Sequence, residues 1–193
     1  MKKKFRKYHS YGNDFILMEE EKNNSKQVSI LCDRYSGVGA AILILIKEKP
    51  LTMTILNQDA SLASMCGNGL CCMIQASYED AILKQGDFIQ TRTQRIQPCI
   101  INEKPFESGY SLDVIDCCYK EGMYFVFVGT QHCVLFEAYD EDKAIELCHI
   151  HKANINFVEV LSPTEIHVTT YEVGVGLTQA CGTGACACAY TSV

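Results

Sequence analysis

The sequence lacks any apolar run long enough to cross a bilayer. Its most apolar stretch, Ala40–Ile46, has seven residues, whereas a membrane-spanning helix needs about 20. A secretory signal is also missing, because the basic N-terminus continues directly into the polar segment Tyr8–Ser10. We therefore expect a cytoplasmic protein with no membrane partner. In that compartment its 12 cysteines are expected to be mostly thiols rather than disulfides.

Basic residues are too few for a general nucleic-acid binder. The 193 residues include 17 Lys and Arg against 23 Asp and Glu, and the net charge of -6 repels a phosphate backbone. The only basic cluster, Lys2–Lys7, is typical of a solvated chain end, so we expect no nucleic-acid partner. With 48% hydrophobic and 21% charged residues, the chain is globular and long enough for one domain or two small ones.

No Cys-x-x-Cys pair occurs, which disfavours zinc-ribbon and thioredoxin-like sites. Two Cys-x4-Cys pairs remain, Cys66 with Cys71 and Cys181 with Cys186. Positions i and i+5 lie about 140° apart around a helix, from its step of roughly 100°. Four-cysteine ligation would therefore need an irregular loop, and we expect no metal.

Two segments form a near-repeat, Met65–Cys71 and Ala180–Cys186. Both read Cys-Gly-x-Gly-x-Cys, and both precede helical sequence. Glycines allow a tight turn and close approach to a ligand, and N–H groups at a helix start bind a carboxylate. A thiol there gains thiolate stabilisation, so its pKa should fall. A single loop of this kind would be read as a turn with core cysteines, but two matched loops favour a site.

Two activated thiols suit one class of reaction. Inverting a stereocentre without a cofactor needs a base on one face of the carbon and an acid on the other. One thiolate removes the α-proton while the opposite thiol delivers a proton, and donors around the α-carboxylate stabilise the carbanion. The loops therefore predict an isomerase that acts on a small amino acid and uses no cofactor.

Short strands, a Gly-rich turn and a helix follow one another twice along the chain, which predicts two similar α+β lobes. The expected helices are Ser25–Cys32, Leu70–Leu83, 140–149 and Ala185–Val193. The expected strands are Phe5–His9, Asp14–Met18, Leu43–Ile46, Met53–Leu56, 88–92, 95–101, 110–115, Met123–Val128, Cys133–Phe136, Ile155–Val160 and Ile166–Tyr171.

Taken together and in order, several motifs resemble those of the diaminopimelate epimerases, amino-acid epimerases that work without pyridoxal phosphate. The motifs that carry the resemblance are Tyr11–Phe15, Cys32–Ala40, Asn57–Gly69, Gly129–Val134, Asn154–Phe157 and Tyr171–Ala187.

The resemblance implies the conversion of LL-2,6-diaminopimelate to meso-diaminopimelate, a step of lysine and peptidoglycan precursor biosynthesis, in a homodimer with no cofactor. It implies two pseudo-symmetric lobes, each a mostly antiparallel sheet or barrel around a central helix, with the active site in the cleft between them. The lobes would be residues 1–116 and 117–193, and the second is expected to be incomplete because family members continue through further strands. By residue, the resemblance assigns catalysis to Cys66 and Cys181, and substrate binding to Asn13, Asn57, Gly67, Asn68, Asn154, Glu172, Gly182 and Thr183.

Several positions depart from the family pattern. An Arg usually follows the Glu, and the Val173 found here cannot make a bidentate carboxylate contact. The other departures are Leu177 for a Glu, Thr130 for an Asn, Cys71 for an Arg and Ile42 in the second motif, which usually continues with Asp and Gln. Two alternatives therefore stay open. One is a related racemase or isomerase for a smaller or more apolar amino acid, and the other is a binding relative without turnover.

Overall fold

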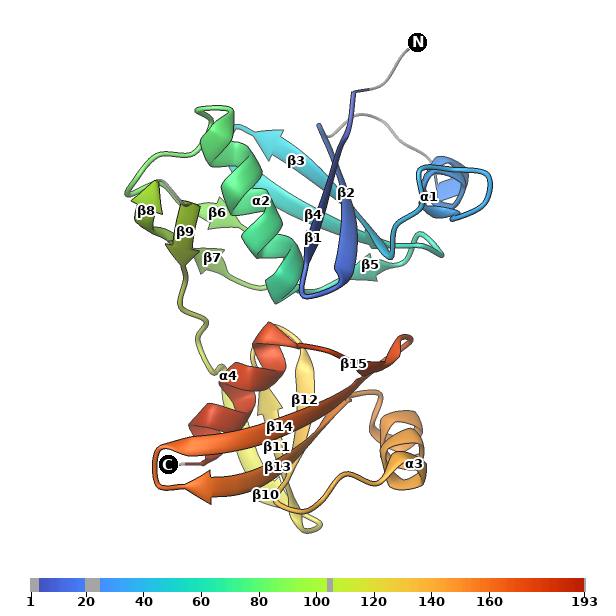
Figure 1. Ribbon diagram of the computed structural model, residues 1–193, viewed down its shortest axis with the longest axis vertical. Helices are drawn as coiled ribbons and strands as arrows, with labels where there is room; N and C mark the ends of the chain where they lie inside the picture. The colour runs from blue at the N-terminus through green and yellow to red at the C-terminus, as the bar shows by residue number, and fades with distance from the viewer. Residues whose placement is uncertain (1–3, 20–24, 104–105, 193) are drawn as a thin grey trace. The chain divides into compact units, whose positions relative to one another are not determined.

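The computed structural model describes residues 4–19, 25–103 and 106–192, which divide into two compact units, Met1–Ser111 and Leu112–Val193 (Figure 1). Lys2 and Lys3 of the basic N-terminal cluster lie outside the described residues. Within the described ranges, no helix is both long and apolar enough to cross a membrane. All twelve cysteines are free thiols.

The described residues of the first unit form one large sheet, a hairpin and two helices (Figure 1). Its elements are β1 (Arg6–Ser10), β2 (Asn13–Glu19), α1 (Ser25–Cys32), β3 (Ile42–Glu48), β4 (Leu51–Asn57), β5 (Leu62–Ala63), α2 (Gly67–Glu79), β6 (Ile89–Gln90), β7 (Arg95–Ile96), β8 (Cys99–Glu103) and β9 (Phe106–Gly109). The sheet has the order β1-β2-β3-β4-β6-β7, with β5 beside β4, and β8 and β9 form the hairpin.

The second unit contains one sheet, in the sequential order β10 to β15, and two helices. Its elements are β10 (Asp116–Lys120), β11 (Met123–Phe127), β12 (Gln131–Leu135), α3 (Glu141–His151), β13 (Asn154–Ser162), β14 (Glu165–Glu172), β15 (Gly176–Thr178) and α4 (Gly182–Thr191). In each unit the crossover helix, α1 or α3, joins a parallel pair, β2 with β3 or β12 with β13. Most other neighbouring strands are antiparallel.

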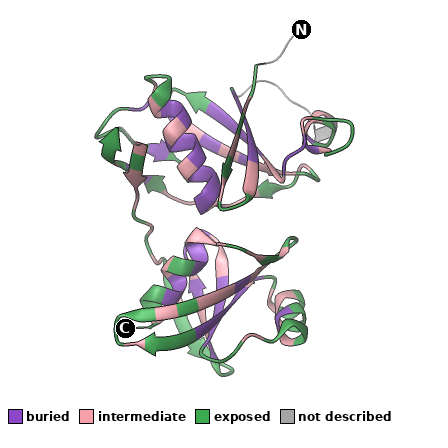
Figure 2. Cartoon of the chain, viewed as in Figure 1, coloured by how far each residue is buried: buried purple, intermediate pink, exposed green. Residues whose placement is uncertain are grey.

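Alternating side chains place a helix on each face of the first sheet. Ile16 and Met18 of β2 pack with Val28 of α1. Phe15, which directly precedes Ile16 in the pleat, faces the other side and lies under the first turn of α2, near Gly69. Most residues in the first turns of α2 are buried, and Figure 2 shows much of this helix in purple. It is the central helix predicted from the sequence.

The second unit repeats this arrangement. Ile155 and Phe157 of β13 pack with Ala144 of α3, whereas Val158 packs with Ala187 of α4 on the opposite face. The predicted α+β class, with mostly antiparallel sheets wrapped around a helix, is confirmed.

Several predicted elements differ in the structure. The strand expected over 95–101 is two strands in different sheets, β7 and β8. The helix expected over Leu70–Leu83 ends at Glu79, because Ala81 adopts a left-handed backbone with φ of 58°. The strand expected at 110–115 is irregular over most of its length, and bonding to β11 begins where the N–H of Ile115 donates to the carbonyl oxygen of Phe127 at 2.9 Å. Leu112 and Val114 instead pack on the core beside α4, which explains an alternating pattern without a partner strand.

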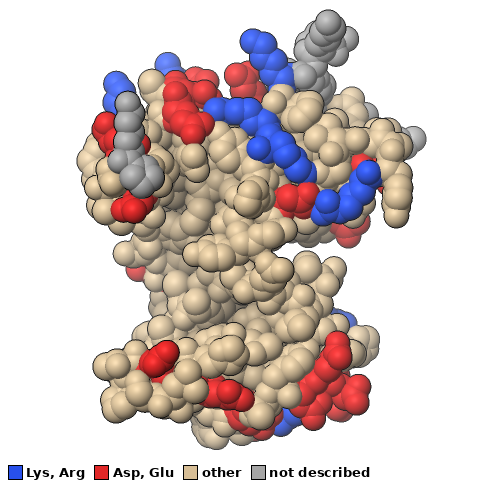
Figure 3. Space-filling view, in the orientation of Figure 1, with Lys and Arg blue, Asp and Glu red and all other residues tan. Residues whose placement is uncertain are grey.

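Basic residues near the N-terminus are paired with carboxylates in the first unit. Arg6 forms ion pairs with Glu79, at 3.7 Å, and with Asp80. Lys7 Nζ lies 2.7 Å from a carboxylate oxygen of Asp14. Figure 3 accordingly shows blue and red side chains next to one another on this unit.

Candidate active site

Each cysteine loop leads into the first turn of a helix. Cys66 caps α2 and Cys181 caps α4, and each sulfur accepts a hydrogen bond from the N–H three residues on, Gly69 or Gly184, at 3.4 Å. The cap backbones are similar, with φ of -146° and ψ of 108° at Cys66 and φ of -127° and ψ of 108° at Cys181. The sequence repeat is therefore a repeated geometry, a thiol where backbone N–H groups converge.

The pairing of the strands shows which residues beneath the Cys66 loop correspond to which residues beneath the Cys181 loop. A Cβ added to Gly69 would meet Ile44 of β3, and one added to Gly184 would meet Asn156 of β13. Each of these strand residues pairs with one on the following strand. On the preceding strand of each sheet, a third residue lies two positions before the one that pairs with Ile44 or with Asn156. The equivalent sets are Phe15, Ile44 and Ile55 in the first unit and His132, Asn156 and Thr170 in the second.

In the first unit, the predicted asparagines lie at one end of the sheet. Asn13 begins β2 and Asn57 ends β4, and Ile42 of β3 pairs between these strand ends. The Asn57 side chain donates to Ser61 Oγ at 2.9 Å. The start of α2 lies over this end of the sheet, since a Cβ added to Gly69 would lie 3.2 Å from the Phe15 ring. The fold thus gathers Asn13 and Asn57 near the loop that contains Cys66, Gly67 and Asn68.

In the second unit, Asn154 begins β13 at the position equivalent to Ile42, and Glu172 ends β14 at the position equivalent to Asn57. Asn154 Oδ1 accepts from the backbone N–H of Val173 at 3.0 Å, and its Nδ2 donates to Thr130 Oγ1 at 3.4 Å. Glu172 Oε1 accepts from Thr178 Oγ1 at 2.7 Å. Burial raises the pKa of Glu172. Its hydrogen bonds to Thr178 and Cys181 act in the opposite direction but do not outweigh burial. Its carboxylate therefore lies beside the second thiol.

Burial dominates the electrostatics of Cys181. It raises the pKa of this thiol to about 11, and the charge of Glu172 raises it further, against lowering by the Thr183 side chain and by the N–H groups of Thr183 and Gly184. The sequence predicts a lowered pKa here, and for Cys181 that prediction is wrong. The helix start does supply donors, but desolvation of the sulfur and the neighbouring carboxylate outweigh them.

A buried polar network supports the second loop. His132 and Asn156 are both fully buried, and Asn156 Nδ2 lies 3.1 Å from His132 Nδ1. Thr170 donates to Asn156 Oδ1 at 3.0 Å, and His132 Nε2 lies 3.0 Å from Thr183 Oγ1. Burial lowers the pKa of His132 to about 4, against the contact with Asn156, so the imidazole is neutral near pH 7. Sequence reasoning missed this network, although Asn156 interrupts an otherwise apolar strand.

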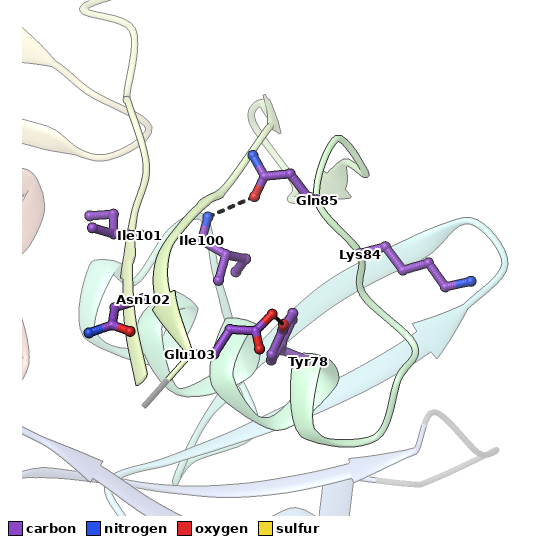
Figure 4. Close-up of a pocket in the computed structure, with 7 residues that line it drawn as sticks. All are labelled: Tyr78, Lys84, Gln85, Ile100, Ile101, Asn102 and Glu103. Atoms are coloured by element: carbon purple, nitrogen blue, oxygen red, sulfur yellow. Dashed lines mark hydrogen bonds between the residues drawn. The ribbon is translucent and has the colours of Figure 1, made fainter. Parts of the chain in front are cut away.

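A cavity of about 700 Å³ lies in the first unit, between the C-terminal part of α2 and β8 (Figure 4). Tyr78 Oη donates to Glu103 at 2.5 Å and the N–H of Ile100 donates to Gln85 at 3.0 Å across it. Its lining residues, Tyr78, Lys84, Gln85, Ile100, Ile101, Asn102 and Glu103, include none predicted for the site. In the described part of the chain, no three His, Cys, Asp or Glu residues gather as a metal site.

The same thiol-capped loops belong to a described protein family. The family model for diaminopimelate epimerase matches residues 5–94 and 124–193, which include both loops. The chain belongs to the diaminopimelate epimerase family. It is 33% identical over 234 residues to the diaminopimelate epimerase of Pelotomaculum thermopropionicum, covering 98% of this chain and 83% of that protein. The enzyme of Trichodesmium erythraeum is also 33% identical, over 97% of this chain and 82% of its own.

Solved structures agree on the fold. A probable proline racemase from Agrobacterium radiobacter matches 98% of this chain and 78% of its own with a TM-score of 0.65, at 10% identity. A PhzF-family phenazine biosynthesis protein from Bacillus anthracis matches 94% of this chain and 75% of its own with a TM-score of 0.61, at 14% identity. The chain is thus an isomerase of the diaminopimelate epimerase family with the two-lobe fold of these proteins.

The positions that depart from the diaminopimelate epimerase pattern surround the second loop more than the first. Val173 follows Glu172 directly and is 47% exposed, and Leu177 on β15 is 56% exposed. Thr130 bonds to His132 at 2.9 Å and so belongs to the buried network. Cys71 lies half-buried on α2, where burial raises its pKa. The side chains of Val173 and Leu177 offer a substrate no charged partner.

Proposed function

We propose that this chain is a cofactor-independent epimerase that converts LL-2,6-diaminopimelate to the meso form, with Cys66 and Cys181 as an acid–base pair. The observation that carries the proposal is the matched geometry of the two thiols, each capping a helix at a Gly-rich loop. A lone thiol at a helix start has many uses, but a repeated one suits a reaction that needs an acid and a base of the same kind.

In the proposed reaction, the thiolate of one cysteine takes the α-proton, and the thiol of the other gives a proton to the opposite face. The enzyme ends with its two sulfur protonation states exchanged, so the reverse reaction starts from the product form. The carboxylate gains enolate character in between, and the N–H groups at Gly67 and Asn68 and at Gly182 and Thr183 would stabilise that charge. The proposed reaction transfers only protons and needs no oxidant, reductant or cofactor.

Glu172 fits the role of the partner for the substrate amine. Its charge raises the pKa of Cys181, which is a thiol at neutral pH, the form that delivers a proton. A substrate ammonium group beside Glu172 would offset that charge and lower the pKa of Cys181 toward neutrality. Asn13, Asn57 and Asn154 would hold the remaining polar groups of the substrate at the strand ends where they lie.

The proposal extends to the organisation of the protein. The units 1–111 and 112–193 would correspond to the two epimerase lobes predicted at 1–116 and 117–193. We also propose a cytoplasmic homodimer that acts in lysine and peptidoglycan precursor biosynthesis. Membership of the diaminopimelate epimerase family supports these points.

The test is a stereochemical assay of the reduced protein with LL-diaminopimelate, in which chiral chromatography follows the meso product. Glu172→Gln should lower turnover about 10- to 100-fold, from the loss of a charged contact of about 1.5–3 kcal/mol. Glu165→Gln, at the exposed start of the same strand, is the matched control and should keep wild-type turnover. No meso product from folded wild-type protein would overturn the proposed substrate, and an unchanged rate for Glu172→Gln would remove Glu172 from the site.

A second candidate is a racemase for a smaller or more apolar amino acid. The apolar side chains of Val173 and Leu177 favour it, because leaving a second substrate carboxylate unpaired costs about 1–3 kcal/mol. Competition between diaminopimelate and monocarboxylic amino acids in the same assay separates the candidates. If the second candidate is correct, Val173→Arg should lower the KM for diaminopimelate and leave the KM for monocarboxylic amino acids unchanged.

A further inference from the structure

The outer strands of the two large sheets differ in how open they are to a further strand. The outer strands are β1 and β7 in the first sheet and β10 and β15 in the second. β7 has two residues and β15 has three, and β1 carries Arg6 and Lys7, both paired with carboxylates of their own unit. Short length and basic side chains discourage an edge from pairing with another chain. β10 is longer and has one charge of each sign, and over the residues that the structure describes no strand lies on its outer side.

The turn after β10 determines which of its backbone groups face outward. Glu121 and Gly122 form a two-residue turn, and their φ values of 56° and 81° are typical of type I′ hairpins. The residues that flank such a turn, here Lys120 and Met123, form a hydrogen-bonded pair, and such pairs alternate along an antiparallel ladder. Every second residue back from Lys120 therefore turns its N–H and C=O toward β11. The residues between them, at positions 117 and 119, turn theirs toward the open edge.

The sequence of β10 is complementary to itself in the antiparallel direction. If a two-fold axis passes through Cys118, Asp116 of one copy lies opposite Lys120 of the other at both ends of the pairing. Cys117 then lies opposite Tyr119, and these are the residues whose backbone groups face outward. Opposite charges that face each other across two strands are favourable, and like charges are unfavourable. One register therefore satisfies the backbone groups and the charges together.

Side chains at this edge leave apolar surface exposed. Tyr119 is 64% exposed and lies against Tyr124 of β11, with the ring centroids 4.8 Å apart. Ile115, directly before β10, is 54% exposed. Lys120 Nζ lies 4.4 Å from the centre of the Phe125 ring, so the cation stays close to the sheet. A second copy placed along β10 would cover apolar side chains and supply a carboxylate for this cation.

We propose that two copies of this chain associate through β10, antiparallel about Cys118, so that their second-unit sheets form one continuous sheet. The inference rests on the homodimer of the proposed function and deepens it by naming the surface at which the copies meet. Pairing through a single strand buries little area, so the dimer is weak, with a dissociation constant in the micromolar range. Exposed ion pairs contribute little stability, so the two charge pairs serve mainly to select the register.

The facing pair of Cys118 residues gives the first test. In the proposed register they form a non-hydrogen-bonded pair, whose Cα atoms lie about 4.5 Å apart, within the range of a disulfide. Diamide, which takes up the two hydrogens that the thiols lose, should therefore link two full-length chains through Cys118, as shown by peptide mass spectrometry. Cys118→Ser should abolish this covalent dimer. Cys99→Ser, at an exposed thiol of β8, is the matched control and should leave the yield unchanged.

Charge reversals test the register by sedimentation velocity of the full chain at low salt. Lys120→Glu sets carboxylates opposite each other at both ends of the pairing, and Asp116→Lys does the same with ammonium groups. Each single variant should raise the dissociation constant of the dimer about tenfold. The double variant restores opposite charges and should return to within about twofold of wild type. Circular dichroism checks the folding of each variant, and if a charge variant does not fold, cross-linking at Cys118 decides.

A protein that stays monomeric over the whole concentration series would overturn the inference. A dimer that neither single reversal weakens, and that diamide does not link through Cys118, would also overturn it but would leave the proposed homodimer intact. None of these measurements needs turnover, so they are independent of the epimerase assay. A dimer linked through Cys118 in a protein that forms no meso product would contradict the proposed catalysis alone.

Discussion

At the scale of single residues, Gly69 and Gly184 occupy equivalent positions under opposite constraints. A Cβ on Gly69 would lie 2.9 Å from Ile44 Cδ1, the far end of a flexible side chain. A Cβ on Gly184 would lie 2.5 Å from Asn156 Oδ1, and hydrogen bonds hold that amide at both of its polar atoms. One support can therefore give way, whereas the other must break hydrogen bonds to do so.

We predict that Gly184→Ala destabilises the protein by about 1–3 kcal/mol, the range of overpacked cores. Gly69→Ala is the matched control, and its cost should be smaller because the Ile44 side chain can adopt another rotamer. Urea unfolding followed by circular dichroism measures both. A larger loss for Gly69→Ala than for Gly184→Ala would contradict the rigid network described around Asn156.

The sequence predicts the residues of the two loops but not their environments. The repeat around Cys66 and Cys181 is visible in the amino-acid sequence, and the structure confirms that both loops lead into a helix start. The pKa of Cys181 could not be predicted, because its burial and the nearness of Glu172 depend on strands that the loop sequence does not contain. The network of His132 and Asn156 could not be predicted for the same reason, because a polar residue in a strand does not reveal its hydrogen-bond partner.

At the scale of elements, one carboxylate joins three segments of the first unit. Asp14, near the start of β2, accepts from Arg34 at 2.7 and 3.0 Å, from Lys7 at 2.7 Å and from the N–H of Ala41 at 3.0 Å. It thus ties β1 and the segment between α1 and β3 to the strand that begins at Asn13. Burial alone would raise the pKa of Asp14, but these hydrogen bonds outweigh it and hold the pKa well below its ordinary range.

Asp14→Asn should lower the free energy of unfolding at pH 7 by about 1–2 kcal/mol, an amount reduced by the exposure of Arg34. The pKa is lower in the folded than in the unfolded state, so the carboxylate stabilises the protein above about pH 4. That stabilisation disappears as the pH falls toward the folded-state pKa. Urea midpoints should therefore differ at pH 7 and converge below pH 4.

Asp116→Asn is the control for that measurement, because Asp116 is exposed on β10. It should leave the midpoint nearly unchanged at both pH values. A difference between wild type and Asp14→Asn that persists unchanged into acid would show that the carboxylate charge is not the stabilising feature.

Among the elements, those with strong apolar alternation are predicted best. β2, β3 and β13 fall where the pattern places them, because one face meets a crossover helix and the other a central helix. The segment 110–115 carries a similar pattern but forms no strand. Alternation of apolar residues does not show whether a segment has a partner strand. Register, and hence the correspondence of Asn156 with Ile44, comes only from the pairing of the strands.

At the scale of the whole molecule, the proposed mechanism requires both sulfurs to reach one α-carbon. Thiols that share a substrate carbon can be oxidised to a disulfide when the substrate is absent. We predict that mild oxidation joins Cys66 to Cys181 and abolishes turnover, and that reduction restores it. Peptide mapping that finds both thiols free after oxidation, with activity intact, would count against the shared site.

The most direct test of the central claim is α-proton exchange in heavy water, with reduced protein and LL-diaminopimelate. The two-thiol account predicts that the wild-type protein incorporates deuterium at the α-carbon as meso product forms. Cys66→Ser and Cys181→Ser should each abolish or severely reduce meso formation, because each removes one of the two proton carriers, with folding checked by circular dichroism. Meso formation at the wild-type rate in either folded variant would contradict the account, because inversion would then proceed without one of the two thiols.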